Sequence, residues 1–374
     1  MRDNPRVTRI ALAVGAPVLA LVAAFVITSL VLLIAGDSVS GVWGQILNLP
    51  THRGYVNILN AASVYYLSAV AVSIGFRMNL FNIGVDGQYR VASFVAAVVA
   101  GEAWLPGYLN TAFAVVAAML AGAAWAGIAG LLRVTRGVSE VISTIMLNLT
   151  ATFLVAYLLR KVAVDGGGNI VATKPVPEGS RVGGFTLFSD TPTQVYGMLV
   201  LAVVVGVAYG FVINRTRFGF DLRATGSSET AAVASGINVK RMVVVSMLLS
   251  GAVAGLVGLP LLFGEAYAYG STFQSGLGFA GIAIALLGRN HPVGIALGAL
   301  LFAFLDEQAN PLQIVLNVSP DIVKITQGTI VLTVVIAYEV VRRYGARIEQ
   351  QRVAGALDDE SSPPPASPNQ EVKA

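Results

Sequence analysis

The sequence predicts an all-α polytopic membrane protein, and three observations support this fold class. Of its 374 residues, 55% are hydrophobic and 12% are charged, whereas soluble domains average about 25% charged residues. The mean hydropathy of +0.73 points the same way. Apolar runs also recur along the chain, and a transmembrane helix needs about 20 such residues.

Ten apolar stretches are candidate transmembrane helices. Their approximate limits are 10–35, 58–76, 82–101, 109–132, 139–160, 195–213, 242–263, 277–288, 292–308 and 323–342. The first stretch exceeds the apolar region of a signal peptide, about 7–15 residues, so we interpret it as a retained span. The eighth is too short to cross unaided. It is therefore either re-entrant or begins earlier, near Phe273.

Ten spans divide into two halves of five, and an odd number per half makes the halves inverted, as in many transporters. If the N-terminus is cytoplasmic, 18 of the 24 Lys and Arg residues fall on the cytoplasmic side, which predicts that both termini are cytoplasmic. Residues 1–348 then form one transmembrane domain with an external loop at 161–194 and a cytoplasmic loop at 214–241. The tail, 349–374, is rich in Pro, Ser and acidic residues and is predicted to be disordered.

Composition excludes several function classes. The chain has no cysteine, which excludes disulfides, a cysteine nucleophile and thiolate metal sites. His52 and His291 are its two histidines and lie far apart in sequence, so no metal site is expected. The net charge of +4 reflects basic loops between spans, which orientation in a lipid bilayer explains without nucleic acid. A membrane enzyme would need a nucleophile or a metal cluster at membrane depth, and no His, Cys or paired-carboxylate arrangement in the sequence supplies one.

The stretch 75–88, GFRMNLFNIGVDGQ, places polar residues and three glycines between two spans. Irregular backbone at membrane depth is tolerated only where it is buried in protein or lines a wet cavity. An acid in such a position is a functional-site candidate, because it is costly and needs a partner. We therefore expect this break to face a substrate pathway, with Asn79, Asn82, Asp86 and Gln88 as its candidate contacts.

A structural interpretation of the same residues remains open. Asp86 lies near the start of the third span, where a negative charge interacts favourably with the helix dipole. It can pair there with Arg77 or Arg90. The neighbouring amides can equally tie the break to adjacent helices.

Two further segments carry related signals. Residues 274–288, QSGLGFAGIAIALLG, are short and glycine-interrupted, and interrupted segments at matching positions of two halves point to a site at the midplane. In the span 139–160, helical spacing puts Ser143 near one face and Thr144 and Asn148 on an adjoining one, and these three are predicted to line the pathway. The alternative is helix packing, which small and hydroxyl residues commonly mediate in membranes.

The cytoplasmic loop 214–241 is predicted to contain a short helix, capped by Ser227 or Ser228 and ended by Gly236. A turn between spans needs only a few residues, so a capped helix indicates a docking element for another protein. Its candidate contacts are Arg223, Glu229, Ala231, Ala232 and Gly236. The chain has no GxxxxGK[ST] phosphate-binding loop, so an ATPase that drives transport must be another polypeptide.

Four motifs follow one another along the chain: FNIGVDGQ at 81–88, SEVISTIMLN at 139–148, LRATGSSETAAVASGI at 222–237 and GFAGIAIALLGRNHPVGI at 278–295. In type and order they resemble the permease subunits of ATP-binding-cassette (ABC) importers in the branched-chain amino acid, ribose and nucleoside group. The nearest resemblance is to nucleoside or simple-sugar permeases.

The resemblance implies a helical core in the bacterial plasma membrane, with a central pathway opened alternately to either side. It implies ABC ATPase subunits that bind ATP and Mg²⁺, an external substrate-binding protein, and a second permease in a heterodimer or homodimer. Glu229, Ala231, Ala232 and Gly236 fall where the family's EAA-like loop meets the ATPase, although this chain has Glu-Thr-Ala-Ala before x3-Gly. No cofactor is implied in this subunit.

The predicted function is therefore the permease subunit of an ATP-driven importer that forms a translocation pathway for nucleosides, and not an enzyme. A simple-sugar permease of the same group is the alternative. A second rival is an ion-coupled secondary transporter in which Asp86 binds a proton or sodium ion. That rival leaves the docking helix without a purpose.

Overall fold

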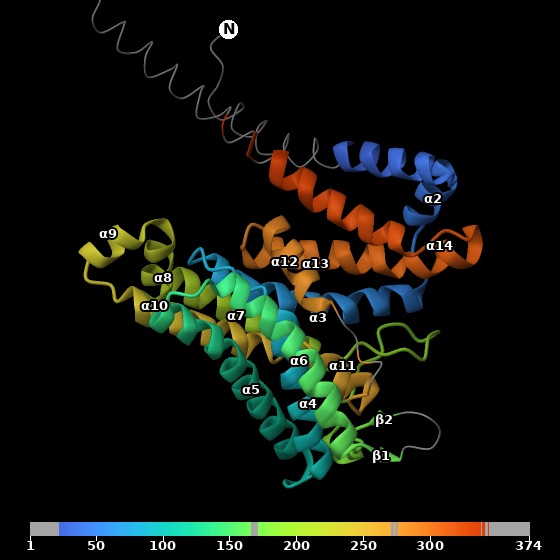
Figure 1. The fold of residues 1–374 in the computed structure, drawn as a ribbon. Helices are drawn as coiled ribbons and strands as arrows, with labels where there is room; N and C mark the ends of the chain where they lie inside the picture. Colours follow the sequence, from blue (N-terminus) through green and yellow to red (C-terminus); the bar gives the residue numbers. More distant parts are fainter. Residues whose placement is uncertain are drawn as a thin grey trace, which may run out of the picture.

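A computed structural model describes residues 22–343, apart from 166–170, 271–272, 274–275, 338 and 341–342. Helices dominate this part of the chain, and each of the ten predicted apolar stretches contains one (Figure 1). The beginning of the first stretch, before residue 22, lies outside the described residues. So does the tail at 349–374, for which disorder was predicted.

The helices follow the predicted stretches closely and add short elements between them. The first helix spans Val22–Ala35, and a final helical segment covers 321–337. The elements between them are α2 (Val39–Ile46), α3 (His52–Phe76), α4 (Val85–Glu102), α5 (Gly107–Arg136), α6 (Glu140–Val162), β1 (Val164–Asp165), β2 (Val171–Ala172), η1 (Glu178–Ser180), α7 (Leu199–Arg215), α8 (Arg217–Ser227), α9 (Glu229–Ala234), α10 (Val239–Ala254), α11 (Leu259–Leu261), η2 (Leu262–Ala266), α12 (Leu277–Leu287), α13 (Pro292–Glu307) and α14 (Ala309–Leu316). The two strands pair antiparallel.

Five helical stretches among the described residues are long and apolar enough to cross a membrane, or six if α7 and α8 count as one span bent by 71°. Broken and short helices do not meet this requirement of length and apolar character. Helix α12 has only 11 residues. Helix α4 has 18 residues and includes Asp86, Arg90 and Glu102. Both helices adjoin the segments, 75–88 and 274–288, that the sequence predicted to be interrupted near a pathway.

Successive helices run between two ends of the molecule. We call them the hairpin end, where α8 and α9 lie, and the sheet end, where β1 and β2 lie (Figure 1). At the hairpin end, Arg77, which follows α3, donates a 2.7 Å hydrogen bond to the carbonyl of Asn290, which precedes α13. At the sheet end, the Asn110 side chain of α5 donates to Ser180 Oγ of η1 at 3.2 Å. Because successive spans alternate in direction, the loops that contain Arg77 and Asn290 are expected on one side, and those that contain Asn110 and Ser180 on the other. The two hydrogen bonds agree with this arrangement.

The packing of helices is reciprocal between the two halves. Helix α5, the fourth apolar helix of the first half, packs along α10 of the second half, and α13 packs along α3. The α5–α10 contact is close, because an ideal β-carbon at Gly122 would lie 2.2 Å from the carbonyl oxygen of Gly251. Small residues allow such close approach in membranes. A reciprocal exchange of this kind is what two related halves produce.

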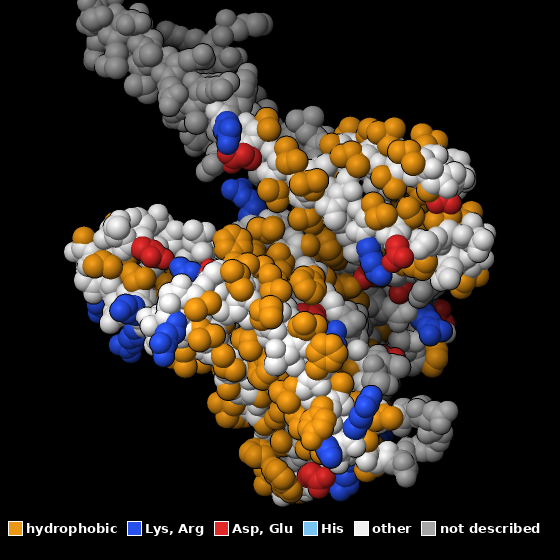
Figure 2. Space-filling model, in the orientation of Figure 1, with side chains coloured by type: hydrophobic (Ala, Val, Ile, Leu, Met, Phe, Trp, Pro, Cys, Tyr) orange, Lys and Arg blue, Asp and Glu red, His pale blue; other side chains and the backbone are white. Residues whose placement is uncertain are grey.

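Helix α3 lies at the centre of the core, and α6 lies at its edge. In their most apolar 18-residue windows, 83% of α3 is buried but only 28% of α6. The first helix, α2, α14 and the final segment surround a separate apolar cluster that includes Leu32, Val42, Leu312 and Val323. Hydrophobic side chains cover much of the visible surface, and Lys and Arg gather near the hairpin end (Figure 2). Such a surface suits lipid contact along the body of the protein.

Candidate substrate pathway and coupling site

The break between α3 and α4 is closed by two buried amide side chains. Asn82 Nδ2 donates to Gln88 Oε1 at 3.0 Å, and Gln88 Nε2 donates back to Asn82 Oδ1 at 2.8 Å. Asn82 Nδ2 also donates to Ser250 Oγ of α10 at 2.8 Å. The Asn82 and Gln88 side chains are 0% and 1% exposed. Buried polar groups need such partners, so in this conformation the two amides hold the break in place.

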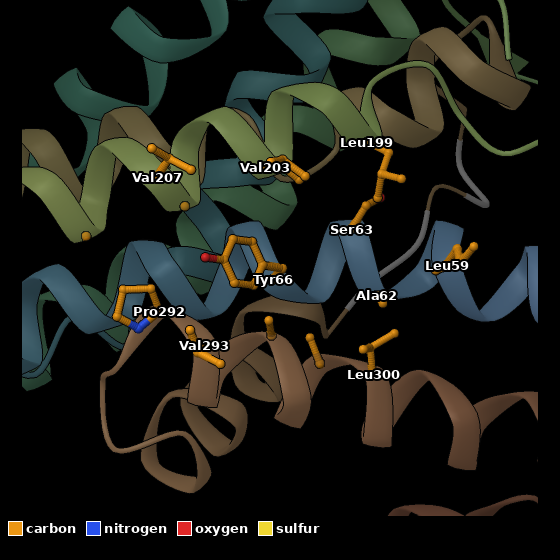
Figure 3. Close-up of a pocket in the computed structure, with 15 residues that line it drawn as sticks. Leu59, Ala62, Ser63, Tyr66, Leu199, Val203, Val207, Pro292, Val293 and Leu300 are labelled. Carbon is orange, nitrogen blue, oxygen red and sulfur yellow. The ribbon is translucent and has the colours of Figure 1, made fainter. Parts of the chain in front are cut away.

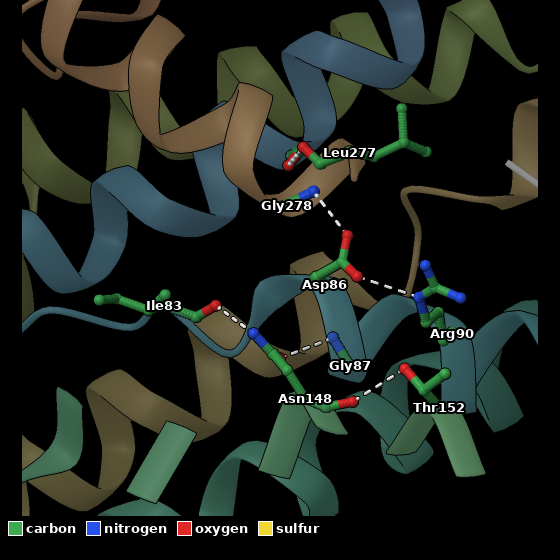
Figure 4. Close-up of polar contacts among 9 residues, drawn as sticks. Ile83, Asp86, Gly87, Arg90, Asn148, Thr152, Leu277 and Gly278 are labelled. Carbon is green, nitrogen blue, oxygen red and sulfur yellow. Dashed lines mark hydrogen bonds and ion pairs between the residues drawn. The ribbon is translucent and has the colours of Figure 1, made fainter. Parts of the chain in front are cut away.

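Asn148 of the neighbouring helix α6 binds the backbone of the same break through its side chain (Figure 4). Its Nδ2 donates to the Ile83 carbonyl at 2.8 Å, and its Oδ1 accepts from the Gly87 backbone at 2.8 Å. The first N–H groups of a helix lack partners within that helix, so Asn148 caps α4 from a neighbouring element. A β-carbon at Gly87 would lie 2.9 Å from Asn148 Oδ1, which explains the need for glycine there.

Asp86 joins the two interrupted segments. Its Oδ2 accepts from Arg90 Nε at 3.0 Å, and its Oδ1 accepts from the Gly278 backbone at 3.3 Å (Figure 4). Asp86 therefore places a negative charge at the start of α12 as well as in the first turn of α4, and both positions are favourable. The breaks near 75–88 and 274–288 thus lie against each other, and Asp86 pairs with Arg90 rather than Arg77.

Of the remaining predicted pathway residues, Thr144 packs on the break, because a β-carbon at Gly84 would lie 3.0 Å from its side chain. Asn79 is exposed in the turn after α3, with a positive φ of 59°. Ser143 and Thr144 are buried on α6, and their hydroxyls donate to the Ser139 and Glu140 carbonyls at 3.0 and 2.7 Å. These two hydroxyls are satisfied within their own helix.

A cavity of about 280 Å³ lies beside the break, between α4, α6, β2 and the linker from η2 to α12. Its lining includes one arginine beside the break, polar side chains of α6, and two aromatic rings of the linker. They are Arg90, Thr152, Arg160, Tyr269 and Phe273. Among the described residues that line this cavity, none is one of the seven predicted from sequence.

The linker that forms one wall of this cavity is held by the segment that follows β2. Thr173 N–H donates to the Tyr269 carbonyl at 2.9 Å, and the Tyr269 N–H donates to Thr173 Oγ1 at 3.0 Å. Val176 N–H donates to the Tyr267 carbonyl at 2.7 Å. Non-helical backbone at membrane depth is tolerated where protein satisfies it or where it lines a cavity. Tyr267 and Tyr269 meet the first condition, and Tyr269, Gly270 and Phe273 line the cavity.

Two stacked rings form the wall itself. The Tyr269 and Phe273 ring centroids are 4.7 Å apart with planes at 26°, and Phe94 of α4 meets Tyr269 edge-on at 5.9 Å. A β-carbon at Gly258 would lie 3.2 Å from the Phe273 ring, so the glycine makes room for it. Sequence reasoning missed both rings. The available signal was a pair of aromatic residues in a glycine-containing linker between interrupted helices.

A larger cavity of about 500 Å³ lies between α3, α7 and α13 (Figure 3). Its lining is almost entirely apolar and includes Leu59, Val203 and Leu300. Tyr66 supplies one polar tip beside them, and a β-carbon at Gly206 would collide with its hydroxyl. Specific binding of a polar substrate requires several placed polar groups, so the Arg90 cavity is the better candidate.

The loop 214–241 folds into a hairpin of two helices, α8 and α9, where the sequence predicted one. Helix α8 is held back against α7 by Arg223, which donates to the Ile213 carbonyl. Ser228 Oγ caps α9 by accepting from the Ala231 backbone at 3.2 Å, and Gly236 follows the helix with φ of +82°. The predicted cap and glycine stop of α9 are therefore confirmed.

The predicted docking residues differ in exposure. Glu229, Ala231 and Gly236 are exposed, whereas Ala232 is buried and Arg223 is half-buried. Since Arg223 contacts the backbone of α7, it shapes the hairpin rather than its outer surface. The exposed residues of α9 offer a small, compact surface to another protein.

A charged network links this hairpin to the break. Arg133 of α5 pairs with Glu140 of α6 through Nη1 and with Glu229 of α9 through Nη2, the latter at 3.6 Å. Glu140 Oε1 accepts from the Phe81 backbone at 3.4 Å. One arginine therefore connects the docking helix, the start of α6 and the break before α4.

The hairpin also touches the break directly. A β-carbon at Gly226 of α8 would lie 2.5 Å from the Arg77 carbonyl oxygen, so α8 packs on the turn after α3.

Among the described residues, no group of three or more His, Cys, Asp or Glu side chains is arranged to hold a metal ion. The features of this site are thus an interrupted pair of helices, a cavity and a helical hairpin with an exposed face.

Interrupted helices around a cavity, in a chain with several apolar spans, define a membrane transport protein. The chain belongs to the family described as "Branched-chain amino acid transport system / permease component", and the match covers residues 54–335. This finding confirms the resemblance that the four motifs indicated.

Similar proteins cover nearly the whole chain. The guanosine ABC transporter permease protein NupP of Bacillus subtilis is 34% identical over 331 residues, 87% of this chain and 93% of its own. The glucose ABC transporter permease protein TsgB13 of Haloferax volcanii is 32% identical, covering 95% and 93%. The nucleoside ABC transporter permease protein NupB of Lactococcus lactis is 29% identical, covering 86% and 90%.

Proposed function

We propose that this chain is the permease subunit of an ATP-driven ABC importer and forms its translocation pathway for nucleosides. The observation that carries the proposal is the Arg133 network, which joins an exposed docking helix to the break beside a membrane cavity. Two of the similar proteins described above are named for guanosine or nucleoside transport. Their similarity along most of the chain supports the substrate class.

The proposed setting is the bacterial plasma membrane, with the hairpin end and both termini in the cytoplasm. Arg133 and Arg136 near the end of α5, and Arg215, Arg217 and Arg241 around the hairpin, give that end its basic character. Cytoplasmic loops carry such an excess of Lys and Arg.

Three partners complete the proposed transporter. An ATPase subunit, which binds ATP and Mg²⁺, would contact the exposed surface of α9 at Glu229, Ala231 and Gly236, with Ala232 and Arg223 supporting that surface from behind. A second permease would pack beside the sparsely buried α6, in a heterodimer or a homodimer. An external binding protein would deliver the substrate at the sheet end.

The proposed mechanism is alternating access without covalent chemistry in this subunit. Movement of the ATPase would shift α9, and Arg133 and Glu140 would pass that movement to the turn before α4. Asn82, Asp86, Gln88 and Asn148 would keep the interrupted helices together as one rigid body, while Asn79, Ser143 and Thr144 would lie along its cytoplasmic part. Rocking of such bodies about a site is a common transport motion.

Simple sugars are the second candidate substrate class, because one similar protein is named for glucose transport. An ion-coupled transporter is the remaining rival, with Asp86 as its ion site. The bonds of Asp86 to Arg90 and to the Gly278 backbone disfavour it, since the carboxylate already has two partners.

The test is uptake of labelled nucleosides and simple sugars by cells with and without this gene. ATP depletion and an ionophore are applied separately. We expect deletion to abolish an ATP-dependent nucleoside uptake that the ionophore does not affect. Uptake that follows the ion gradient would contradict the importer, and loss of sugar uptake alone would favour the sugar permease.

A further inference from the structure

We propose that the cavity between Arg90 and Phe273 is a binding subsite for the heterocyclic base of a nucleoside. The inference rests on the proposed function, because it names where that substrate binds in this chain. Three features of the cavity carry it: its depth between the two ends, its aromatic wall and its arginine.

The Arg90 side of the cavity lies near the middle of the path between the hairpin end and the sheet end, and its opposite side reaches β2 at the sheet end. Helix α12 has 11 residues, or roughly 16 Å at 1.5 Å per residue, about half of a hydrocarbon core that is about 30 Å thick. It ends at the hairpin end, so its first turn begins near the midplane. Asp86 binds that first turn and also binds Arg90. Transporters bind substrates beside such half-length helices.

The aromatic wall suits a planar base. Phe273 lines the cavity and is only partly buried, whereas Tyr269, which also lines it, is 5% exposed. Tyr269 is fixed by Thr173 through two hydrogen bonds, so the ring stacked on it is supported. Bases stack on aromatic side chains regardless of their identity. Both purines and pyrimidines therefore fit this wall.

Arg90 places hydrogen-bond donors beside that wall. Its Nε is bound to Asp86 at 3.0 Å, which orients the guanidinium, and its terminal nitrogens point away from Asp86 (Figure 4). Guanidinium carries five N–H donors in a planar fork. Such a fork matches the paired O6 and N7 acceptors of guanine and reaches single carbonyls of pyrimidines. The geometry favours carbonyl-bearing bases, with guanosine first.

The size and the polarity of the cavity agree with one small ligand. Its volume of about 280 Å³ is close to the lower end of small-molecule sites, about 300–1,000 Å³. Thr152 and Arg160 of α6 add polar groups toward the sugar side of such a ligand. The 500 Å³ cavity between α3, α7 and α13 offers volume without comparable donors.

The experiment uses the complete transporter with all its subunits in proteoliposomes and measures uptake of labelled guanosine, uridine and ribose. Phe273→Leu keeps apolar bulk but removes the aromatic face, and Phe273→Tyr keeps the ring. We expect Phe273→Leu to lower kcat/KM for both nucleosides by about 5- to 150-fold, the effect of losing one base–aromatic stack. Phe273→Tyr should remain close to wild type.

A second variant, Arg90→Lys, is measured in the same uptake assay. Lysine retains a charge for Asp86 but lacks the planar fork, so guanosine uptake should fall more than uridine uptake. In wild-type transporter, photolabelling with an azido-substituted guanosine should mark the peptide that contains Phe273. This last readout does not depend on the folding of any variant.

The outcomes separate the subsite from the function. Nucleoside uptake by wild type, with unchanged kcat/KM in Phe273→Leu, overturns the subsite and leaves the importer standing. Uptake of ribose without nucleosides overturns both. Equal loss in the Leu and Tyr variants at normal transporter amounts, or photolabelling confined to other segments, also overturns the subsite.

Discussion

Asn148 is the residue on which the start of α4 depends most directly. One side chain binds both the Ile83 carbonyl and the Gly87 N–H. We expect Asn148→Ala to lower the melting temperature of the purified transporter, because each buried polar group left without a partner costs about 1–3 kcal/mol. Differential scanning fluorimetry in detergent measures the shift.

Thr150 on the same helix provides the matched control. It is exposed, and its hydroxyl donates to the Met146 carbonyl within α6. Thr150→Ala should therefore leave the melting temperature nearly unchanged. Equal melting temperatures for Asn148→Ala and wild type would show that the break does not need this side chain.

Residue identities predicted the break but not the cavity wall. Asp86, Asn82 and Gln88 stood out because polar side chains beside a span are costly, and the pairing of Asp86 with Arg90 was among the expected alternatives. Tyr269 and Phe273 did not stand out, since aromatic residues carry no such cost. Their placement depends on Thr173, a partner 96 positions from Tyr269, and no local pattern encodes that contact.

At the scale of elements, the hairpin and the break are joined by Arg133. We expect Arg133→Gln to reduce nucleoside uptake by at least about fivefold, the lower range of typical coupling between sites, while the complex still assembles and hydrolyses ATP. Parallel measurements of uptake and ATPase activity in proteoliposomes test this. Uncoupled hydrolysis is expected because the network transmits movement and binds no nucleotide.

Arg136→Gln is the control, because Arg136 is exposed in the last turn of the same helix. It should transport like wild type. A double variant, Arg133→Glu with Glu140→Arg, should recover part of the uptake lost in Arg133→Glu by restoring an ion pair. Normal uptake in Arg133→Gln would contradict the coupling route.

Local signals predicted α9 but not α8. Ser228 and Gly236 mark the ends of α9, and cap chemistry is readable from neighbouring residues. Helix α8 has few apolar residues at helical spacing and was interpreted as loop. Its position is fixed instead by the Arg223 contact with Ile213 and by packing of Gly226 on the turn after α3. Tertiary contacts of this kind are not visible in a short window.

At the scale of the whole molecule, hydropathy predicted the order of the apolar helices among the described residues, because lipid imposes a length on each span. Parity alone predicted two inverted halves, and the reciprocal packing of α5 on α10 and α13 on α3 agrees. The separate cluster formed by the first helix, α2, α14 and the final segment was not predicted. Apolar residues indicate burial or lipid contact but do not name the neighbouring helix.

The most direct test of the account is the accessibility of the Arg90 cavity in the complete, membrane-embedded transporter. The chain has no cysteine, so Thr152→Cys places a single thiol on the cavity lining. A membrane-impermeant maleimide is added from the external side, with and without ATP and vanadate. Leu187→Cys, exposed in the external loop, provides the control.

The account predicts that the labelling rate of Thr152→Cys changes severalfold with nucleotide state, because the ATPase moves the hairpin and the cavity changes sides. Guanosine should slow the labelling, and Leu187→Cys should react alike in every state. A Thr152→Cys rate that neither nucleotide nor nucleoside alters would contradict the claim that this cavity is part of the transport pathway.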